Sequence, residues 1–147
     1  MWIYLSTMRF RIFVLVAFVF FGCFTACRDL SEPGGGIENS SVERAFEQRQ
    51  RDVQVMGEGV VSRILSDDRS GSPHQRFVVR LSSGQTVLIQ HNIDLAPRIA
   101  QLKEGDTVSF YGEYIWNEQG GLIHWTHDDP AGRHVAGWVK HKGRTYQ

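Results

Sequence analysis

Residues 76–91 read Arg-Phe-Val-Val-Arg-Leu-Ser-Ser-Gly-Gln-Thr-Val-Leu-Ile-Gln-His, and this stretch decides the fold. Apolar side chains alternate with their neighbours on both sides of Ser82-Ser83-Gly84, a triplet typical of a tight hairpin turn. A period of two indicates half-buried β-strands. The stretch therefore predicts two antiparallel strands, with Arg76 and Arg80 together on the face opposite Phe77.

The same period continues on both sides of the hairpin. It predicts further strands over 53–65 and 107–116, and a fifth strand that begins at 122. Two glycines in the first of these strands mark a bend or bulge in a long, curling strand. The tail, 135–147, predicts a terminal hairpin that extends the sheet or covers an edge.

Two short helices are expected beside the strands. Ser40 and Glu43 form a capping box, and the apolar spacing that follows predicts a helix over about 41–51. Asp94 is a good N-cap and precedes a proline suited to a first helical turn, so a second helix is predicted over 95–102.

Three strands, a short helix and two more strands are the order of an oligonucleotide/oligosaccharide-binding (OB) barrel. The predicted fold is therefore mainly β: a small OB-like five-stranded antiparallel barrel with a short helix between strands three and four, an N-terminal helix and a C-terminal hairpin. A single domain is expected over 41–147, with its barrel over 53–147. Another small antiparallel barrel or a sandwich would share this periodicity.

The N-terminus has the plan of a secretory signal. Two arginines precede the ten uninterrupted apolar residues 12–21, and the uncharged run ends at Cys27. A membrane-spanning helix needs about 20 apolar residues, so a signal peptide over 1–27 is favoured. Translation begins at Met1 or at Met8.

The end of this signal, Phe24-Thr25-Ala26-Cys27, resembles a bacterial lipobox, with Phe24 where leucine is usual. We expect Cys27 to carry the lipid and to anchor the chain to a membrane on the periplasmic side of the bacterial envelope; soluble export is the alternative. A proline and three consecutive glycines then predict a flexible tether over 28–40.

Charge and cysteine content narrow the class of protein. The chain has 16 basic and 16 acidic residues, and removing 1–26 takes away only Arg9 and Arg11, which leaves 14 against 16. Proteins that bind nucleic acid through bulk charge show a basic excess, so nucleic acid is not an expected partner. Both cysteines precede residue 28, so the mature domain holds no internal disulfide.

Four of the six histidines gather near the end of the chain. A turn of the composition Asp129-Pro-Ala-Gly132 would fold the chain back and bring His134 toward His127 and Asp128. Three nitrogen or oxygen ligands and a water suit a catalytic zinc or a similar divalent ion. His124 is a fourth candidate, although a continuous strand would turn it away from His127.

Two functions are weighed on these residues. A metal-dependent hydrolase, either a phosphodiesterase or a nuclease, would use the cluster over 124–134, with Asp128 or Asp129 as ligand or base and Arg133 facing an anion. The alternative that the sequence favours is a binding module of the envelope, with an envelope protein, a peptide or an oligosaccharide as partner. Its candidate ligand-binding residues are Arg76, Arg80, His91, Trp116, Trp125 and Arg133.

Two plainer interpretations stay open. Tryptophans in small barrels are often core residues, and histidines in a turn-rich segment are often ordinary hydrogen-bonding residues. Several imidazoles in one segment also suit a pH sensor, because they change charge between about pH 5 and 8.

Five strings carry a family resemblance: GEGVV (57–61), HQRFVVRLSSGQT (74–86), HNIDLAPRI (91–99), LKEGDTVSFYGEY (102–114) and IHWTHDDPAGRH (123–134). With the closing HKGRTYQ, they resemble the bacterial domain-of-unknown-function family 3465 over nearly the whole mature chain. The resemblance implies an exported protein and supports the domain boundary. The family carries no established activity, so the resemblance implies no mechanism.

Overall fold

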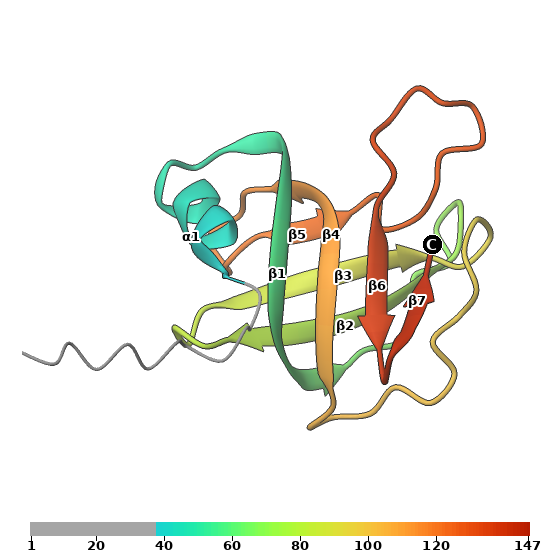
Figure 1. Cartoon of the computed structure of the whole chain (residues 1–147), viewed down its shortest axis with the longest axis horizontal. Coiled ribbons are helices and arrows are strands. Elements are labelled where there is room, and N and C mark those ends of the chain that lie inside the picture. Colours follow the sequence, from blue (N-terminus) through green and yellow to red (C-terminus); the bar gives the residue numbers. More distant parts are fainter. Residues whose placement is uncertain (1–37) are drawn as a thin grey trace, which may run out of the picture. The chain divides into compact units, whose positions relative to one another are not determined.

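The computed structural model describes residues 38–147, which form one helix and seven strands (Figure 1). In chain order these are α1 (Ser40–Glu47), β1 (Arg51–Ile64), β2 (His74–Leu81), β3 (Thr86–Asn92), β4 (Thr107–Ile115), β5 (Leu122–His124), β6 (Trp138–His141) and β7 (Arg144–Tyr146). The predicted signal peptide, Cys27 and nearly all of the tether lie outside the described residues.

The first five strands close into a barrel in the order β1-β2-β3-β5-β4, and β4 returns to pair with β1. The five-stranded barrel is confirmed, but the prediction that it is antiparallel throughout is wrong, because β3 and β5 pair in parallel. Strand parity explains this exception. Directions that alternate around a closed ring of five strands must leave one neighbouring pair parallel.

Glycine permits the close approach at which β1 changes partner. The first part of β1 pairs with β4 and its end pairs with β2, and Gly59 pairs with both. A Cβ added at Gly59 would lie 2.3 Å from the carbonyl oxygen of Arg80, nearer than two such atoms can approach. A bulge lies between Val61 and Arg63, beyond the glycines at which a bend or bulge was predicted.

The core fills the barrel with the inward side chains of alternating strand positions. In β2 and β3 these are Phe77, Val79, Val87 and Ile89, all of them 1% exposed or less. Helix α1 adds Val42 and Ala45 to the same apolar cluster. The helix begins one residue earlier and ends four residues earlier than predicted, and Asn39, rather than Ser40, is its N-cap.

The predicted helix over 95–102 is wrong, and residues 93–106 form an irregular connection. The side-chain amide of Gln75 takes the place of a backbone hydrogen bond that a helix would have made at Ile99. The side chain of Gln75 accepts from the backbone N–H of Ile99 and donates to its carbonyl, at 2.9 and 3.1 Å. The Asn92 side chain accepts from the backbone N–H of Asp94 and of Leu95, two groups that would have no partner within the predicted helix.

The predicted terminal hairpin is confirmed. β6 pairs with β4, and β7 pairs with β6, so the hairpin extends the barrel sheet beyond β4. Within residues 38–147, no helix has the length and apolar character needed to cross a membrane.

Candidate functional site

The predicted histidine cluster begins where β5 stops. The strand ends at His124 because Trp125 adopts a left-handed backbone, with φ of 52°. The chain then loops out and returns at Gly137, whose N–H donates to the carbonyl of His127 at 3.0 Å. A Cβ at Gly137 would lie 1.9 Å from the Trp125 carbonyl oxygen, so only glycine fits this return. We call residues 125–137 the histidine loop.

Asp129 organises the histidine loop from within. Its carboxylate accepts hydrogen bonds from the backbone N–H of Ala131 (2.9 Å), Arg133 (2.7 Å) and His134 (3.0 Å). These bonds, that of Ala131 first, hold the pKa of Asp129 below its usual value. The predicted turn is present, since the Gly132 N–H donates to the Asp129 carbonyl. The Asp129 carboxylate therefore stabilises the conformation of the histidine loop.

Glu113, which the sequence analysis did not select, joins two of the cluster's histidines. It faces outward from β4 opposite His124, in register with it across the β4–β5 pair. His124 Nε2 donates to one carboxylate oxygen at 2.9 Å, and His134 Nε2 donates to the other at 2.6 Å. The turn thus brings His134 to Glu113 on the barrel wall, and not to Asp128 as expected.

The hydrogen bonds of His134 require its charged form. Nδ1 faces the Val135 carbonyl at 3.1 Å and Nε2 faces the Glu113 carboxylate, so both nitrogens must donate. Burial lowers the pKa of His134, but the Val135 carbonyl and Glu113 outweigh it, and the pKa is raised above its usual value. The ring also stacks on Trp125, with centroids 4.1 Å apart and planes 4° apart.

His91 lies inside the barrel and is 0% exposed. Its Nε2 donates to the Pro97 carbonyl at 3.3 Å, and its Nδ1 lies 2.9 Å from the Thr126 hydroxyl. Burial is the largest influence on the ring and lowers the pKa of His91 to about 4. His91 is therefore a neutral core residue that ties β3 to the start of the histidine loop, and it offers nothing to an external ligand.

The candidate metal ligands do not converge. His127 is buried and its Nδ1 donates to the carbonyl of Asp128 at 2.6 Å, while the Asp128 side chain is exposed. Among residues 38–147, no group of three His, Cys, Asp or Glu side chains is placed to hold a metal ion. Each of the four histidines proposed from the sequence is engaged in hydrogen bonds within the protein.

Two other residues that were predicted to contact a ligand, Trp116 and Arg133, have separate surroundings. Trp116 is partly buried against the core, and the guanidinium of Arg49 lies over its ring at 5.1 Å from the centroid. The side chain of Arg133 is exposed on the histidine loop. Trp116 therefore has a packing role.

Arg76 and Arg80 do share the outer face of β2, as predicted, and that face is hollowed. Its lining comes from three adjacent strands and includes Val60, Arg63, Val78, Arg80, Thr86 and Leu88. Register places Val60, Arg80 and Thr86 in one row across β1, β2 and β3, and places Arg63, Val78 and Leu88 in the next. We call this surface the arginine groove.

The arginine groove is a chain of connected hollows. A hollow of about 610 Å³ lies beside Gly59 and reaches Arg80; the next, of about 290 Å³, lies between Arg80 and Arg63. A third, of about 270 Å³, shares Arg63 with the second and continues to Asn117 in the loop after β4. The groove thus crosses the outer face of three strands.

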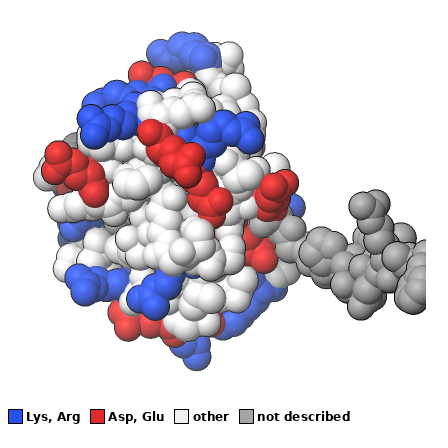
Figure 2. All heavy atoms as spheres, turned by 90° about the vertical axis from the view of Figure 1, so that its left-hand side faces the viewer, with Lys and Arg blue, Asp and Glu red and all other residues white. Residues whose placement is uncertain are grey.

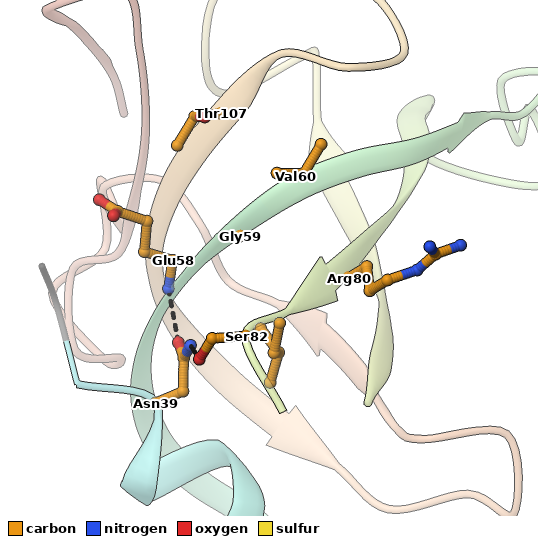
Figure 3. Close-up of a pocket in the computed structure, with 8 residues that line it drawn as sticks. Asn39, Glu58, Gly59, Val60, Arg80, Ser82 and Thr107 are labelled. Carbon is orange, nitrogen blue, oxygen red and sulfur yellow. Dashed lines mark hydrogen bonds between the residues drawn. The ribbon is translucent and has the colours of Figure 1, made fainter. Parts of the chain in front are cut away.

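Carboxylates do not neutralise the two arginines of the groove. Within residues 38–147, the guanidinium groups of Arg63 and Arg80 make neither an ion pair nor a hydrogen bond. Glu58 and Glu104 each line a hollow together with Arg80, but Glu58 accepts from the Ser109 hydroxyl and Glu104 from the backbone N–H of Ile64. Figure 3 shows Arg80 extending away from Asn39 and Glu58.

The family of the chain follows from a sequence comparison. A family model described as "Protein of unknown function (DUF3465)" matches residues 31–147. The chain belongs to the DUF3465 family. The match spans the helix and all seven strands, and it confirms the resemblance drawn from the sequence strings. A search of curated proteins found no match.

Two residues of this DUF3465 chain that were not predicted from the sequence, Glu113 and Arg63, lie in predicted strands, and strand alternation indicates which way such residues face. Glu113 alternates with the inward Gly112 and Tyr114, so it faces outward, and the tight connection after β4 sets its register with His124. Arg63 belongs to the predicted first strand, but the bulge shifts its phase. Thr126 gave no comparable signal, because its contact with His91 depends on the left-handed backbone at Trp125.

Proposed function

We propose that this protein is a binding module of the bacterial envelope that holds an anionic ligand in the arginine groove. The observation that carries the proposal is the pair Arg63 and Arg80, two exposed guanidinium groups on a hollowed sheet face that have no carboxylate partner among residues 38–147. Unpaired arginines side by side favour a ligand that supplies the negative charge.

The strand order supports an OB-like assignment of the barrel. OB barrels bind ligands across strands two and three, between the loop after strand one and the loop after strand four. The arginine groove crosses β2 and β3 and ends at Asn117 in the loop after β4. The arginine groove therefore lies on the surface that an OB barrel would use to bind a ligand.

The net charge of the chain does not account for the binding of an anionic ligand. Figure 2 shows basic and acidic groups interspersed over one face of the molecule, and the whole chain has equal numbers of both. Recognition rests instead on the local pair of arginines. The histidine loop gives less support to a hydrolase, because the Asp129 carboxylate and both nitrogens of His134 are engaged in hydrogen bonds.

The proposal is tested with three anionic probes: a glutamate-rich peptide, an oligogalacturonate and tripolyphosphate. Calorimetry on the full chain should detect binding of at least one probe, and the double substitution Arg63→Ala/Arg80→Ala should abolish it. The matched control is Arg44→Ala/Arg51→Ala, which removes two exposed arginines of α1 and β1 away from the groove. Binding of no probe, or binding that survives in the groove variant, would overturn the proposal.

We also propose the lipid anchor at Cys27, on the lipobox-like sequence that precedes it. In a bacterial host, radiolabelled palmitate should be incorporated into the chain and should be lost in Cys27→Ser. Cys23→Ser is the control and should keep the label. Label that persists without Cys27 would rule out that residue as the anchor.

A further inference from the structure

We infer that the ligand of the arginine groove is an extended polypeptide segment in which acidic side chains alternate with aliphatic ones. This inference rests on the proposed function and specifies its ligand. Three properties of the groove carry it: the two arginines, the aliphatic side chains beside them, and, within residues 38–147, the absence of aromatic side chains from the lining.

The arginines point to carboxylates. A guanidinium presents five N–H donors in a planar fork that pairs with a carboxylate through two parallel hydrogen bonds. Arg63 and Arg80 lie on adjacent strands and line the same hollow, one row apart in the sheet register. They can therefore hold two acidic side chains of one chain at the same time.

Aliphatic side chains lie beside the arginines, together with the hydroxyl groups of Ser62 and Thr86. Val78 is the cross-strand partner of Arg63, Val60 is that of Arg80, and Leu88 is the next residue in the row of Val78. Val60 is 45% exposed. A polyphosphate would leave these side chains in water and gain nothing from them. A ligand that also carries apolar groups would bury them, and apolar burial is favourable at about 25 cal/mol per Å².

The spacing suits an extended peptide. Outward residues of a strand, such as Val78 and Arg80, recur every two positions, which is about 6.6 to 6.8 Å. An extended peptide presents its own side chains on one face at this same interval. Thr86 and Gln119 also line the groove, and within residues 38–147 their side chains make no hydrogen bond, so they remain available to a peptide backbone.

The lining argues against nucleic acids and sugars. Proteins that bind single-stranded nucleic acids stack the bases on aromatic side chains, and sugar rings are held on similar flat surfaces. Within the described residues, no Trp, Tyr or Phe lines the groove. Aromatic rings gather over β4 and β6 instead, where the centroids of Tyr111 and Trp138 lie 6.2 Å apart.

Three fluorescein-labelled peptides of equal length test the inference on the full chain. The first alternates Glu with Val and Leu; the second replaces Val and Leu by Ser; the third replaces Glu by Gln. Anisotropy titrations are made at low ionic strength, where salt screens the ion pairs least. The first peptide should bind, the second should bind about fivefold or more weakly because it buries less apolar surface, and the third should not bind.

The groove variant and its control complete the test. Arg63→Ala/Arg80→Ala should bring binding of the first peptide below detection, as the replacement of its Glu by Gln does, whereas Arg44→Ala/Arg51→Ala should leave that binding unchanged. Circular dichroism verifies that both variants are folded.

Each negative outcome separates the two proposals. If oligogalacturonate or tripolyphosphate binds in the groove but the first peptide does not bind up to about 1 mM, the peptide inference is wrong and the binding module stands. Equal binding of the first and second peptides would also overturn it, since the aliphatic surface would then play no part. If no probe binds, both proposals fail.

Discussion

Glu113 connects two segments of the chain at a single carboxylate. One oxygen accepts from His124 of β5 and the other from His134 of the histidine loop. The two histidines differ in pKa although they share this partner. Burial is the main cause for His124 and lowers its pKa, whereas for His134 the Val135 carbonyl and Glu113 outweigh burial and raise its pKa.

Glu113→Gln should lower the pKa of His134, because the amide removes the negative charge that stabilises the imidazolium. The pKa of His124 should fall further below its usual value for the same reason. Titration of the imidazole resonances by NMR measures both. Glu118→Gln, in the exposed turn after β4, is the control, and an unchanged pKa of His134 in Glu113→Gln would refute the shared-carboxylate account.

Gly59→Ala should destabilise the barrel by about 1–3 kcal/mol, the usual cost of overpacking. The new Cβ would meet the Arg80 carbonyl oxygen, a backbone atom that moves only if β1 and β2 separate. Urea unfolding followed by tryptophan fluorescence gives the free energy of unfolding. Ser83→Ala, at the exposed hairpin turn, should be nearly neutral; equal stability of both variants would contradict the close approach.

At the scale of elements, the alternation of apolar and polar residues predicted the strands, because strand formation depends on neighbouring residues in the sequence. The alternation around Phe77 and Val87 placed β2, β3 and their hairpin, and the same period placed β4 and β5. The prediction of a helix over 95–102 failed because Gln75, which is distant in sequence, bonds to the backbone N–H and carbonyl of Ile99.

The candidate site could also be predicted only in part, because several of its contacts depend on residues that are distant in the sequence. The turn at Asp129 follows from composition, but the destination of His134 depends on which barrel residue faces the returning loop, and that residue is Glu113. The position of Arg63 in the hollow that Arg80 also lines depends on the β1–β2 register and on the bulge. Neither register nor bulge position follows from alternation alone.

Asp129→Ala should loosen the histidine loop without unfolding the barrel. The substitution removes the acceptor of three backbone N–H groups, so amide hydrogen exchange at Ala131, Arg133 and His134 should accelerate. Exchange in β2 and β3 should stay as in the unmodified protein. Unchanged exchange at the three loop amides would show that the carboxylate does not organise the loop.

At the scale of the whole molecule, His91 should make the fold less stable in acid. Its pKa is about 4 in the folded state and about 6.5 when unfolded, so between these values the unfolded chain binds a proton that the folded chain does not. Stability therefore falls as the pH drops from about 6.5 to 4, by about 3 kcal/mol from this residue. His134 acts oppositely, because its raised pKa adds stability at low pH that is lost as the pH rises through that value.

The contribution of His91 is isolated by comparison with His91→Gln, whose amide can still bond to Thr126 and Pro97. Urea unfolding at several pH values should show the two proteins converging in stability as the pH falls from about 6.5 to 4. The lowered pKa of Asp129, Asp106 and Asp67 also weakens the fold in acid, but equally in both proteins. A constant stability difference across this range would show that His91 does not resist protonation.

The central claim is that the outer face of β1, β2 and β3 binds an anionic ligand. Amide chemical-shift mapping of the isotope-labelled full chain tests it most directly, with the peptide that alternates Glu with Val and Leu as titrant and oligogalacturonate and tripolyphosphate as further probes. The shifts should concentrate at Arg63, Val78, Arg80, Thr86 and Leu88, should be absent from the histidine loop and should be lost in Arg63→Ala/Arg80→Ala. Shifts confined to Tyr111, Trp138 or the histidine loop, or no shifts with any of the three probes, would contradict it.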